Sequence, residues 1–402
     1  MSRFGNPILA WEESENREAG LEFATFRNKA YIEFNYYNKL TTGILVPDQL
    51  PLATGTTASP IVNSASMRNS GIEINLTWKD KIGEVRYNIG GNFAYNRNRV
   101  TKLKGQLTRG WNEVNGTNVY STNIGQVSNT VGNNQRNLEG HLFKEYYVRQ
   151  RYKGDGSYYG SDGAVNPNGG PRDGMIRTEA DYKWVQDMKT AGYSFSPVNT
   201  VGKEQLYYGD FLYADLNGDK IYGNENDMDF TGTSDVPKYI YGLNLGFEYK
   251  GFDLQMLWSG EGRLQYYWND EGYSNNIVRD GNGIAQRVAD DHYFYDSANP
   301  SDPRTNINGY YARLKYNGDN INTAANNTYL YNADFIKLRN LQVGYTFNSK
   351  LTERFHIRNL RVYFSGENLL MFSKFPGADP EIGAAAKYPT MKQYAFGLNF
   401  GF

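Results

Sequence analysis

The sequence has no cysteine and little histidine. None of its 402 residues is a cysteine, and three are histidines. Disulfide bonds and cysteine-ligated zinc are therefore excluded, and three histidines leave little for a His-rich metal site. The net charge of −1, from 42 basic and 43 acidic residues, argues against a nucleic-acid partner, because polyanions are bound through basic surfaces.

Long apolar runs are also missing. No stretch of about 18 apolar residues occurs, so the sequence predicts no transmembrane helix. The mean hydropathy of −0.68 is typical of a soluble protein, but a transmembrane β-barrel has a similar average because its lumen and loops are polar. Residues 1–20 lack the apolar core and the cleavage site of a secretory signal, which indicates either a protein that is not exported or a fragment.

Aromatic residues, in contrast, are abundant. They make up 15% of the chain and include 34 tyrosines and 21 phenylalanines. These residues favour β-strands and also form the girdles at the membrane interfaces of β-barrels.

Bulky apolar and small or polar side chains alternate in segments of about 10 to 14 residues, the length that a tilted strand needs to cross a bilayer. In residues 238–250 the apolar face begins with Tyr239 and ends with Tyr249. Tyrosines at both rims are typical of a strand that meets water at two interfaces. The pattern predicts about nine strands, at residues 17–26, 30–42, 70–79, 85–96, 238–250, 252–262, 334–347, 360–371 and 393–402.

One alternating strand fits both a soluble β-sandwich and an outer-membrane barrel. The connections favour the barrel, because short ones alternate with long ones, as periplasmic turns alternate with external loops. The predicted fold class is all-β, an antiparallel transmembrane β-barrel segment with long extracellular loops. The predicted organisation is barrel strands in 1–96, an extracellular loop subdomain in 97–237, and C-terminal barrel strands in 238–402 with extracellular loops 263–333 and 372–392.

The insert 97–237 is too long for a bare loop, so we expect structure within it. The stretches "FKEYYVRQRY" and "LYYGDFLYADL" are strand-like, and glycine-, asparagine- and aspartate-rich turns separate them. The spacing of Tyr182, Val185 and Met188 predicts a short helix.

Several stretches in order resemble the C-terminal part of a SusC-like (SusC/RagA type) TonB-dependent outer-membrane transporter. They span most of the chain, from Asn6 to the terminal Phe402, and read "NPILAWEESENREAGLEF", "GDFLYADLNGDKIYGNENDMDFTGTSDVPKYIYGLNLGFEYKGFDL", "YNADFIKLRNLQVGYTF", "NLRVYFSGENLLMFSKFPGADPE" and "YPTMKQYAFGLNFGF".

The resemblance implies TonB-dependent import of a large nutrient, an oligosaccharide or a peptide, across the outer membrane of a Gram-negative cell. It implies a SusD-like surface lipoprotein and the TonB complex as partners, the latter through an N-terminal part not recognisable here, and membrane lipid around the barrel. A family barrel has about 22 strands, so this chain is expected to be a truncated product or an excised segment, with the missing portion before Met1. The alternating strand that ends in Phe402 resembles the assembly signal of such barrels.

The sharpest local motif is "DLNGDKIYGNEND". Asp215, Asn217 and Asp219 hold positions one, three and five of a calcium loop of the EF-hand kind, with Glu225 and Asp227 near its end. Two departures weaken the motif: Lys220 replaces the usual glycine at position six, and Asn226 occupies position twelve. The alternative is a turn in which these side chains accept hydrogen bonds from backbone amides.

Candidate substrate contacts lie in the outer loops. Five aromatic side chains there have rings suited to stacking on sugars, namely Tyr266, Tyr267, Trp268, Trp111 and Trp184. Asn269 and Asp270 are suited to accept hydrogen bonds from sugar hydroxyls. The alternative for residues 266–268 is girdle packing just beyond a strand end.

Enzyme signatures are missing, and the chain is predicted not to be an enzyme. "GDGSYYGSDG" is an acidic turn-rich loop that would repel phosphate, and "YFSGENL" lacks the second glycine of a nucleophile elbow. Two other classes stay open at this point. They are an extracellular calcium-stabilised β-sandwich glycan-binding module or adhesin, and a passive porin.

Overall fold

The structure is a computed structural model. It describes residues 6–47, 60–132, 134–198, 206–268, 277–278, 283–316, 321–384 and 388–401. The terminal Phe402 lies outside the described residues.

One large antiparallel sheet dominates the fold, and within the described residues it has nine strands in the order in which they follow along the chain. Every strand predicted from the alternation is confirmed, and several are longer than predicted at the end that faces the long loops. The strands are β1 (Glu13–Thr25), β2 (Ala30–Pro47), β3 (Ile61–Ile82), β4 (Val85–Lys102), β13 (Tyr239–Tyr249), β14 (Phe252–Gly262), β19 (Phe335–Thr346), β20 (Asn359–Ser373) and β21 (Gln393–Gly401).

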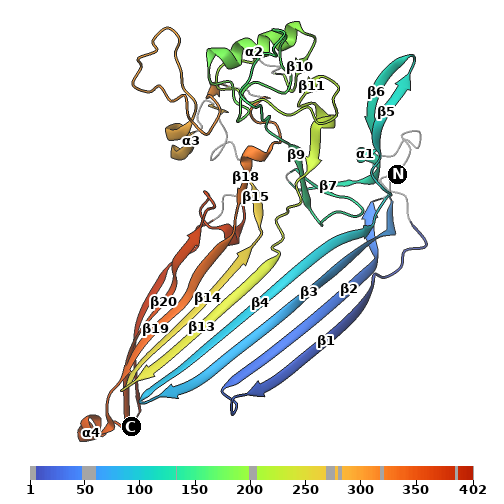
Figure 1. Ribbon diagram of the computed structural model, residues 1–402. Helices are drawn as coiled ribbons and strands as arrows, with labels where there is room; N and C mark the ends of the chain where they lie inside the picture. The colour runs from blue at the N-terminus through green and yellow to red at the C-terminus, as the bar shows by residue number, and fades with distance from the viewer. Residues whose placement is uncertain are drawn as a thin grey trace.

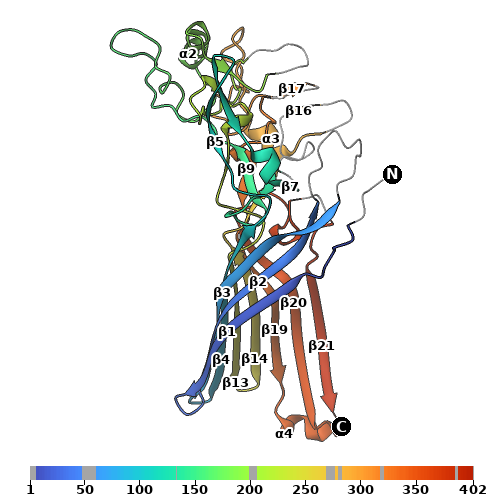
Figure 2. The same ribbon diagram turned by 90° about the vertical axis from the view of Figure 1, so that its right-hand side faces the viewer.

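Short and long connections lie at opposite ends of this curved sheet (Figure 1 and Figure 2). The β13–β14 turn is Lys250–Gly251, whose φ angles of 47° and 89° suit a tight hairpin. The β19–β20 connection holds the short helix α4 (Ser349–Thr352), which lies beside the C-terminus at the same end. The predicted alternation of short turns and long loops is therefore confirmed.

No helix in the described ranges is long and apolar enough to cross a membrane.

The strand register places the bulky apolar residues of all neighbouring strands on one face. Leu243, for example, pairs with Gly91 on one side and Trp258 on the other, and Phe364 pairs with Phe396. This apolar face is open, with Leu76 50%, Leu243 36% and Phe396 84% exposed. A sandwich would bury such a face against a second sheet, so the sandwich alternative does not fit.

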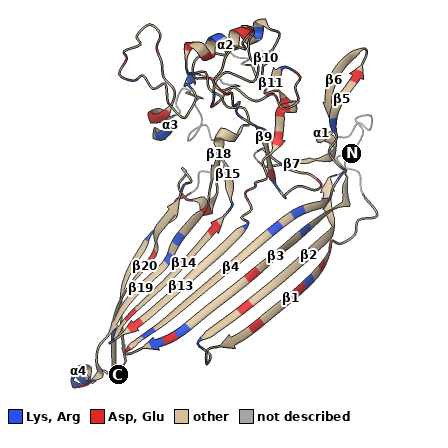
Figure 3. Ribbon diagram, viewed as in Figure 1, with Lys and Arg blue, Asp and Glu red and all other residues tan. Residues whose placement is uncertain are grey.

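The opposite, polar face carries amides and carboxylates. Glu33 accepts hydrogen bonds from Asn35 (3.0 Å) and, across the strand pair, from Asn75 (2.9 Å). Charged residues recur along the strands (Figure 3), and in the middle of the sheet the register places Glu33, Glu73 and Gln255 on this face.

The described residues of the insert 97–237 and of loop 263–333 fold into a separate body beyond one end of the sheet, here called the loop body (Figure 1). The predicted helix is confirmed as α2 (Glu179–Thr190), which begins with a capping box between Thr178 and Asp181. Other elements of the long connections are α1 (Ile124–Val127), α3 (Gln286–Asp291), β5 (Arg109–Val114), β6 (Thr117–Thr122), β7 (Asn129–Val131), β8 (Gln135–Asn137), β9 (Glu145–Arg149), β10 (Ser194–Phe195), β11 (Ile221–Tyr222), β12 (Met228–Phe230), β15 (Gln265–Tyr267), β16 (Ile277–Val278), β17 (Lys315–Tyr316) and β18 (Leu330–Asn332).

One strand-like stretch of the insert differs from expectation. "FKEYYVRQRY" forms β9, but "LYYGDFLYADL" makes only isolated bridges, at Phe211 and Tyr213. Gly209, with a φ of 81°, interrupts the extended backbone there.

Two large apolar cores of the loop body can be followed in the described residues. The first surrounds Trp184 and Met188 of α2. The second joins Tyr146 and Tyr213 of the insert to Tyr293 and Tyr329 of loop 263–333. The two long connections therefore share a core, whereas the boundaries of the predicted subdomain 97–237 stay a prediction.

Candidate functional site

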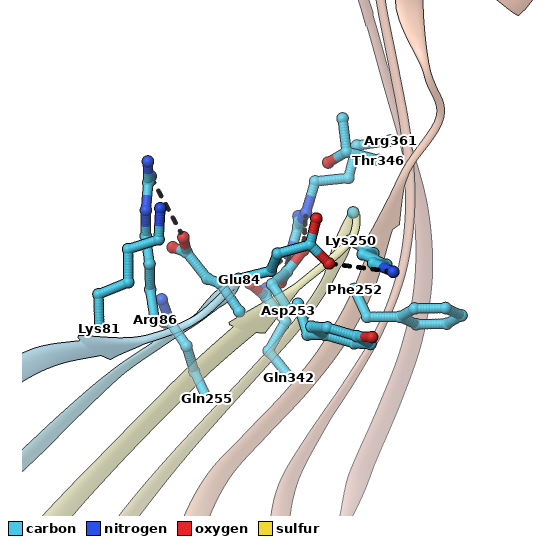
Figure 4. Close-up of a pocket in the computed structure, with 13 residues that line it drawn as sticks. Lys81, Glu84, Arg86, Lys250, Phe252, Asp253, Gln255, Gln342, Thr346 and Arg361 are labelled. Atoms are coloured by element: carbon cyan, nitrogen blue, oxygen red, sulfur yellow. Dashed lines mark hydrogen bonds and ion pairs between the residues drawn. The ribbon is translucent and has the colours of Figure 1, made fainter.

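A charged cluster lines the polar face at the short-turn end of the sheet (Figure 4). Arg361 of β20 reaches across β19 to Asp253 of β14, with its Nη2 2.6 Å from Oδ2 and its Nε 3.0 Å from Oδ1. Two weaker pairs lie beside it, Lys250 with Glu84 at 3.0 Å and Arg86 with Glu248 at 3.9 Å. The cluster lines an open cavity of about 630 Å³.

Glycine makes room for the strongest of these pairs. Gly344 lies between the two strands, and a Cβ there would be 2.5 Å from both Asp253 Oδ1 and Arg361 Nη2. Arg361 Nη2 also donates to Gln342 Oε1 at 3.0 Å. The arrangement is a water-accessible surface of hydrogen-bond donors and acceptors.

The predicted calcium residues lie together in one loop, but their oxygens accept bonds from backbone amides. Asp215 accepts from Gly218 (2.7 Å) and Lys220 (3.0 Å), Asn217 accepts from Asp219 (3.0 Å), and Asp219 accepts from Ile221 (2.8 Å). Among the residues that the structure describes, no group of three or more Asp, Glu, His or Cys is placed to hold a metal. This geometry matches the backbone-bonded alternative, and the calcium site stays a prediction.

Asp227 lies at the end of the same loop. It is fully buried and accepts from the amides of Leu216 (2.7 Å), Gly223 (2.8 Å) and Asn224 (3.0 Å). Burial raises the pKa of Asp227 to about 6, although these hydrogen bonds favour the ionised form. Glu225 belongs to the short helical turn that precedes Asp227.

The predicted substrate residues are packed into the structure. Trp268 is only 7% exposed and contacts Phe375, with ring centroids 5.6 Å apart, and Arg287, whose guanidinium lies 5.2 Å from the ring. Tyr267 is buried as well, and Tyr266 packs against Phe375. This geometry favours the packing alternative for the three rings.

The remaining loop candidates are dispersed. Trp184 is fully buried in the core of the loop body, whereas Trp111 is exposed on the β5–β6 hairpin. Asn269 and Asp270 lie outside the described residues.

Sequence reasoning missed an aromatic cavity of about 800 Å³ in the loop body. Tyr207 and Tyr208 meet the segment 292–295 there, and Tyr208 and Tyr295 are in edge contact at 5.9 Å. The polar lining includes Thr305 and Arg304. The tyrosine pair and the "HYFY" cluster are visible in the sequence, but they lie in different long connections, and only the shared core brings them together.

Comparison with known proteins agrees with this architecture. The family model "TonB dependent receptor-like, beta-barrel" matches residues 2–201. Over the whole chain, the sequence is 24% identical to TonB-dependent receptor P3 of Formosa agariphila, of which it covers 35%. It is 22% identical to TonB-dependent receptor SusC of Bacteroides thetaiotaomicron, where the match covers 99% of the chain and 32% of SusC. The chain therefore spans about a third of the length of the curated relatives it matches.

A solved structure shares the fold. The RagAB peptide importer in its open-open state aligns with 100% of this chain and 36% of its own, at a TM-score of 0.67 and 20% identity. The RagAB peptide transporter gives a TM-score of 0.65 over 99% of this chain and 36% of its own, also at 20% identity. Because the family model, the relatives and the open apolar face of the sheet agree, the chain belongs to the TonB-dependent receptor family and forms part of a β-barrel of the SusC and RagA type.

Proposed function

We propose that this chain is part of an importer that carries a large nutrient, an oligosaccharide or a peptide, across the outer membrane of a Gram-negative cell. The observation that carries the proposal is the continuous apolar face of the large sheet, which is open to its surroundings while the other face is polar. Membrane lipid against the first face and an aqueous bore inside the second satisfy both surfaces.

The relatives support TonB-dependent import as an activity of full-length receptors, of which this chain spans about a third of the length. We propose that the TonB complex acts through an N-terminal part outside this chain, and that a SusD-like surface lipoprotein covers the loop body. The solved relative is a peptide importer by its own description, which supports peptides as one cargo class. Transport then works by conformational gating, and we propose no catalysis.

Two measurements test this function in cells that carry the full-length protein. The protein should stay in the membrane pellet until detergent is added, and growth on a panel of oligosaccharides and peptides should reveal one dependent cargo. Deletion of TonB should abolish that growth. Release without detergent would contradict the barrel, whereas growth that survives TonB deletion would indicate a passive porin.

For cargo contact, we propose the aromatic cavity in addition to the predicted set Tyr266, Tyr267, Trp268 and Asp270. Exposed tyrosine faces suit sugar rings and apolar peptide side chains, and Tyr207 is 41% exposed. Tyr207→Ala should lower the apparent affinity for cargo by about tenfold, measured by uptake at several concentrations. Trp268→Ala is the comparison, since loss of uptake with that variant alone would favour the predicted set.

Calcium is the proposed cofactor, at Asp215, Asn217, Asp219, Glu225 and Asp227. For Ca²⁺ to bind, the side-chain oxygens must give up the hydrogen bonds that they accept from backbone amides and coordinate the ion instead. Calorimetric titration of Ca²⁺ into the chelator-treated full-length protein tests the site, with Asp215→Asn as the matched variant. Equal binding by both proteins, or none by either, would remove the proposal.

A further inference from the structure

The connection between β20 and β21 is folded back and fixed at two points. This connection includes residues 374–384, here called the strap. Near its start, Phe375 packs against Tyr266 and Trp268 in a small apolar core. The strap then forms a 3₁₀ turn, Pro380–Ile382, capped by Asp379 through a bond from the Glu381 amide at 3.0 Å.

Two cationic side chains of β19, Lys337 and Arg339, form ion pairs with this turn. Lys337 Nζ lies 2.6 Å from Asp379 Oδ2 and 2.8 Å from Glu381 Oε2. Arg339 donates through Nη1 to Glu381 Oε2 at 2.6 Å and through Nη2 to the other oxygen, while its Nε donates to Ser259 Oγ at 2.6 Å.

These ion pairs lie on the polar face, near the end of the sheet that carries the long loops. Lys337 pairs with Ser259 of β14, whereas its neighbours Ile336 and Leu338 turn to the apolar face. The register of β19 then shifts between Leu338 and Asn340, so that Arg339 is an extra, unpaired position in the ladder. This bulge lets Lys337 and Arg339 share the polar face while Leu341 still points to the apolar one.

The ion pair between Lys337 and Asp379 is buried. The Lys337 side chain is 2% exposed and that of Asp379 6%. A buried ion pair contributes little net stability compared with apolar residues of the same size, but removal of one partner leaves a costly unpaired charge. Such a pair therefore favours one arrangement of the strap over all arrangements that separate the charges.

We propose that Lys337 and Arg339 form an ionic clasp that holds the strap closed against the polar face at the outer mouth of the bore. The cations of the clasp come from "FIKLRN" and its carboxylates come from "FPGADPE", and both stretches carry the family resemblance. The assignment of this face to the bore rests on the proposed function, but the contact between strap and sheet does not.

Hydrogen exchange of strap amides in the full-length protein tests the clasp without any cargo. Lys337→Met should raise the amide exchange rates of residues 379 and 381–384 at least tenfold, because Asp379 loses its cationic partner and keeps only the Thr390 hydroxyl as a side-chain donor. The double variant Lys337→Met/Asp379→Asn should recover most of the protection, since no unpaired charge remains. Arg361→Met, which breaks an ion pair at the far end of the same face, should leave the strap unchanged.

Unchanged strap exchange in Lys337→Met, with the sheet intact, would overturn the clasp. If Lys337→Met does not assemble, the strap-side variant Asp379→Asn/Glu381→Gln leaves the barrel strands untouched and carries the same expectation. These outcomes are independent of transport, so a failed clasp and a failed import function are distinguishable.

Discussion

At the scale of single residues, the polar face depends on close approaches that only glycine permits. Gly71 of β3 lies against the backbone carbonyl of Tyr95 and the hydroxyl of Tyr37, which would be 2.6 Å from an added Cβ. Gly90 of β4 lies on the same face, and the nearest atom to a Cβ there is 3.7 Å away. The sequence shows both as glycines in alternating strands and does not distinguish them.

We expect Gly71→Ala to destabilise the barrel by about 1–3 kcal/mol, because the backbone of β4 must shift to admit the methyl group. Gly90→Ala has room for it and should change stability by less than about 0.5 kcal/mol. The temperature at which the full-length protein loses its compact form on semi-native gel electrophoresis measures both. Equal effects of the two variants would contradict the packing described for Gly71.

Residue identity alone also left the acidic loop ambiguous. Asp215, Asn217 and Asp219 have the spacing of calcium ligands and equally the chemistry of backbone-bonded turns. The choice depends on which way each oxygen points, and that direction is set by the fold of residues 215–227, where Asp227 is buried beneath the loop.

At the scale of elements, the bulge in β19 keeps Lys337 on the polar face and Leu341 on the apolar face. Deletion of Arg339, the extra residue, should restore a regular ladder in which both residues keep their faces. A deletion in a strand without a bulge instead turns apolar side chains towards the polar face, because the side-chain period is two residues. We therefore expect nearly normal amounts of folded protein in the outer membrane for the deletion of Arg339, as measured by quantitative immunoblot of membrane fractions.

Deletion of Asn244 in β13 is the control for that deletion, because β13 pairs with both of its neighbours without a register shift. It removes one residue from an unbroken alternation, so Leu243 and Leu245 cannot both stay on the apolar face. This variant should reach the membrane in much smaller amounts. Similar amounts of the two variants would mean that the bulge in β19 does not set the strand register.

The strap should be insensitive to pH across the neutral range. Burial favours the neutral acid, but hydrogen bonds from Lys337 and Thr390 outweigh it and hold the pKa of Asp379 below its ordinary value of 3.8. The bond from Arg339 lowers the pKa of Glu381 below 4.5 despite partial burial. Glu261 faces the same cluster and repels Glu381.

Carboxyl groups with lowered pKa values stabilise the closed strap above their ordinary pKa, and the stabilisation is lost as the pH falls through the folded values. Strap protection factors, corrected for intrinsic exchange, should therefore be constant from about pH 8 to pH 5 and fall only below about pH 4. A loss between pH 7 and pH 5 would contradict an ionised clasp.

At the scale of the whole molecule, the two long connections share an apolar core, and we expect them to unfold together. Tyr293 of loop 263–333 is buried among residues of the insert and donates to the Arg177 carbonyl at 2.9 Å. Tyr293→Ala should cost about 3–5 kcal/mol of loop-body stability and should expose both connections to protease together, while the sheet stays protected.

Tyr310→Ala is the matched control, because Tyr310 lies in the same loop and is 43% exposed. Limited proteolysis followed by mass spectrometry should show little change for it. Cleavage confined to loop 263–333 in Tyr293→Ala would show that the two connections fold independently.

The sequence by itself determined the strands, their faces and the end at which each loop lies, because a two-residue repeat is a local property and each turn or loop reverses the chain once. It also contained the stretches of the family resemblance. The tertiary structure alone decided that Trp268 packs inside, that Tyr208 contacts Tyr295, and that Lys337 pairs with Asp379. These contacts join residues distant along the chain, and their geometry depends on a bulge and a shared core that leave no periodic signal in the sequence.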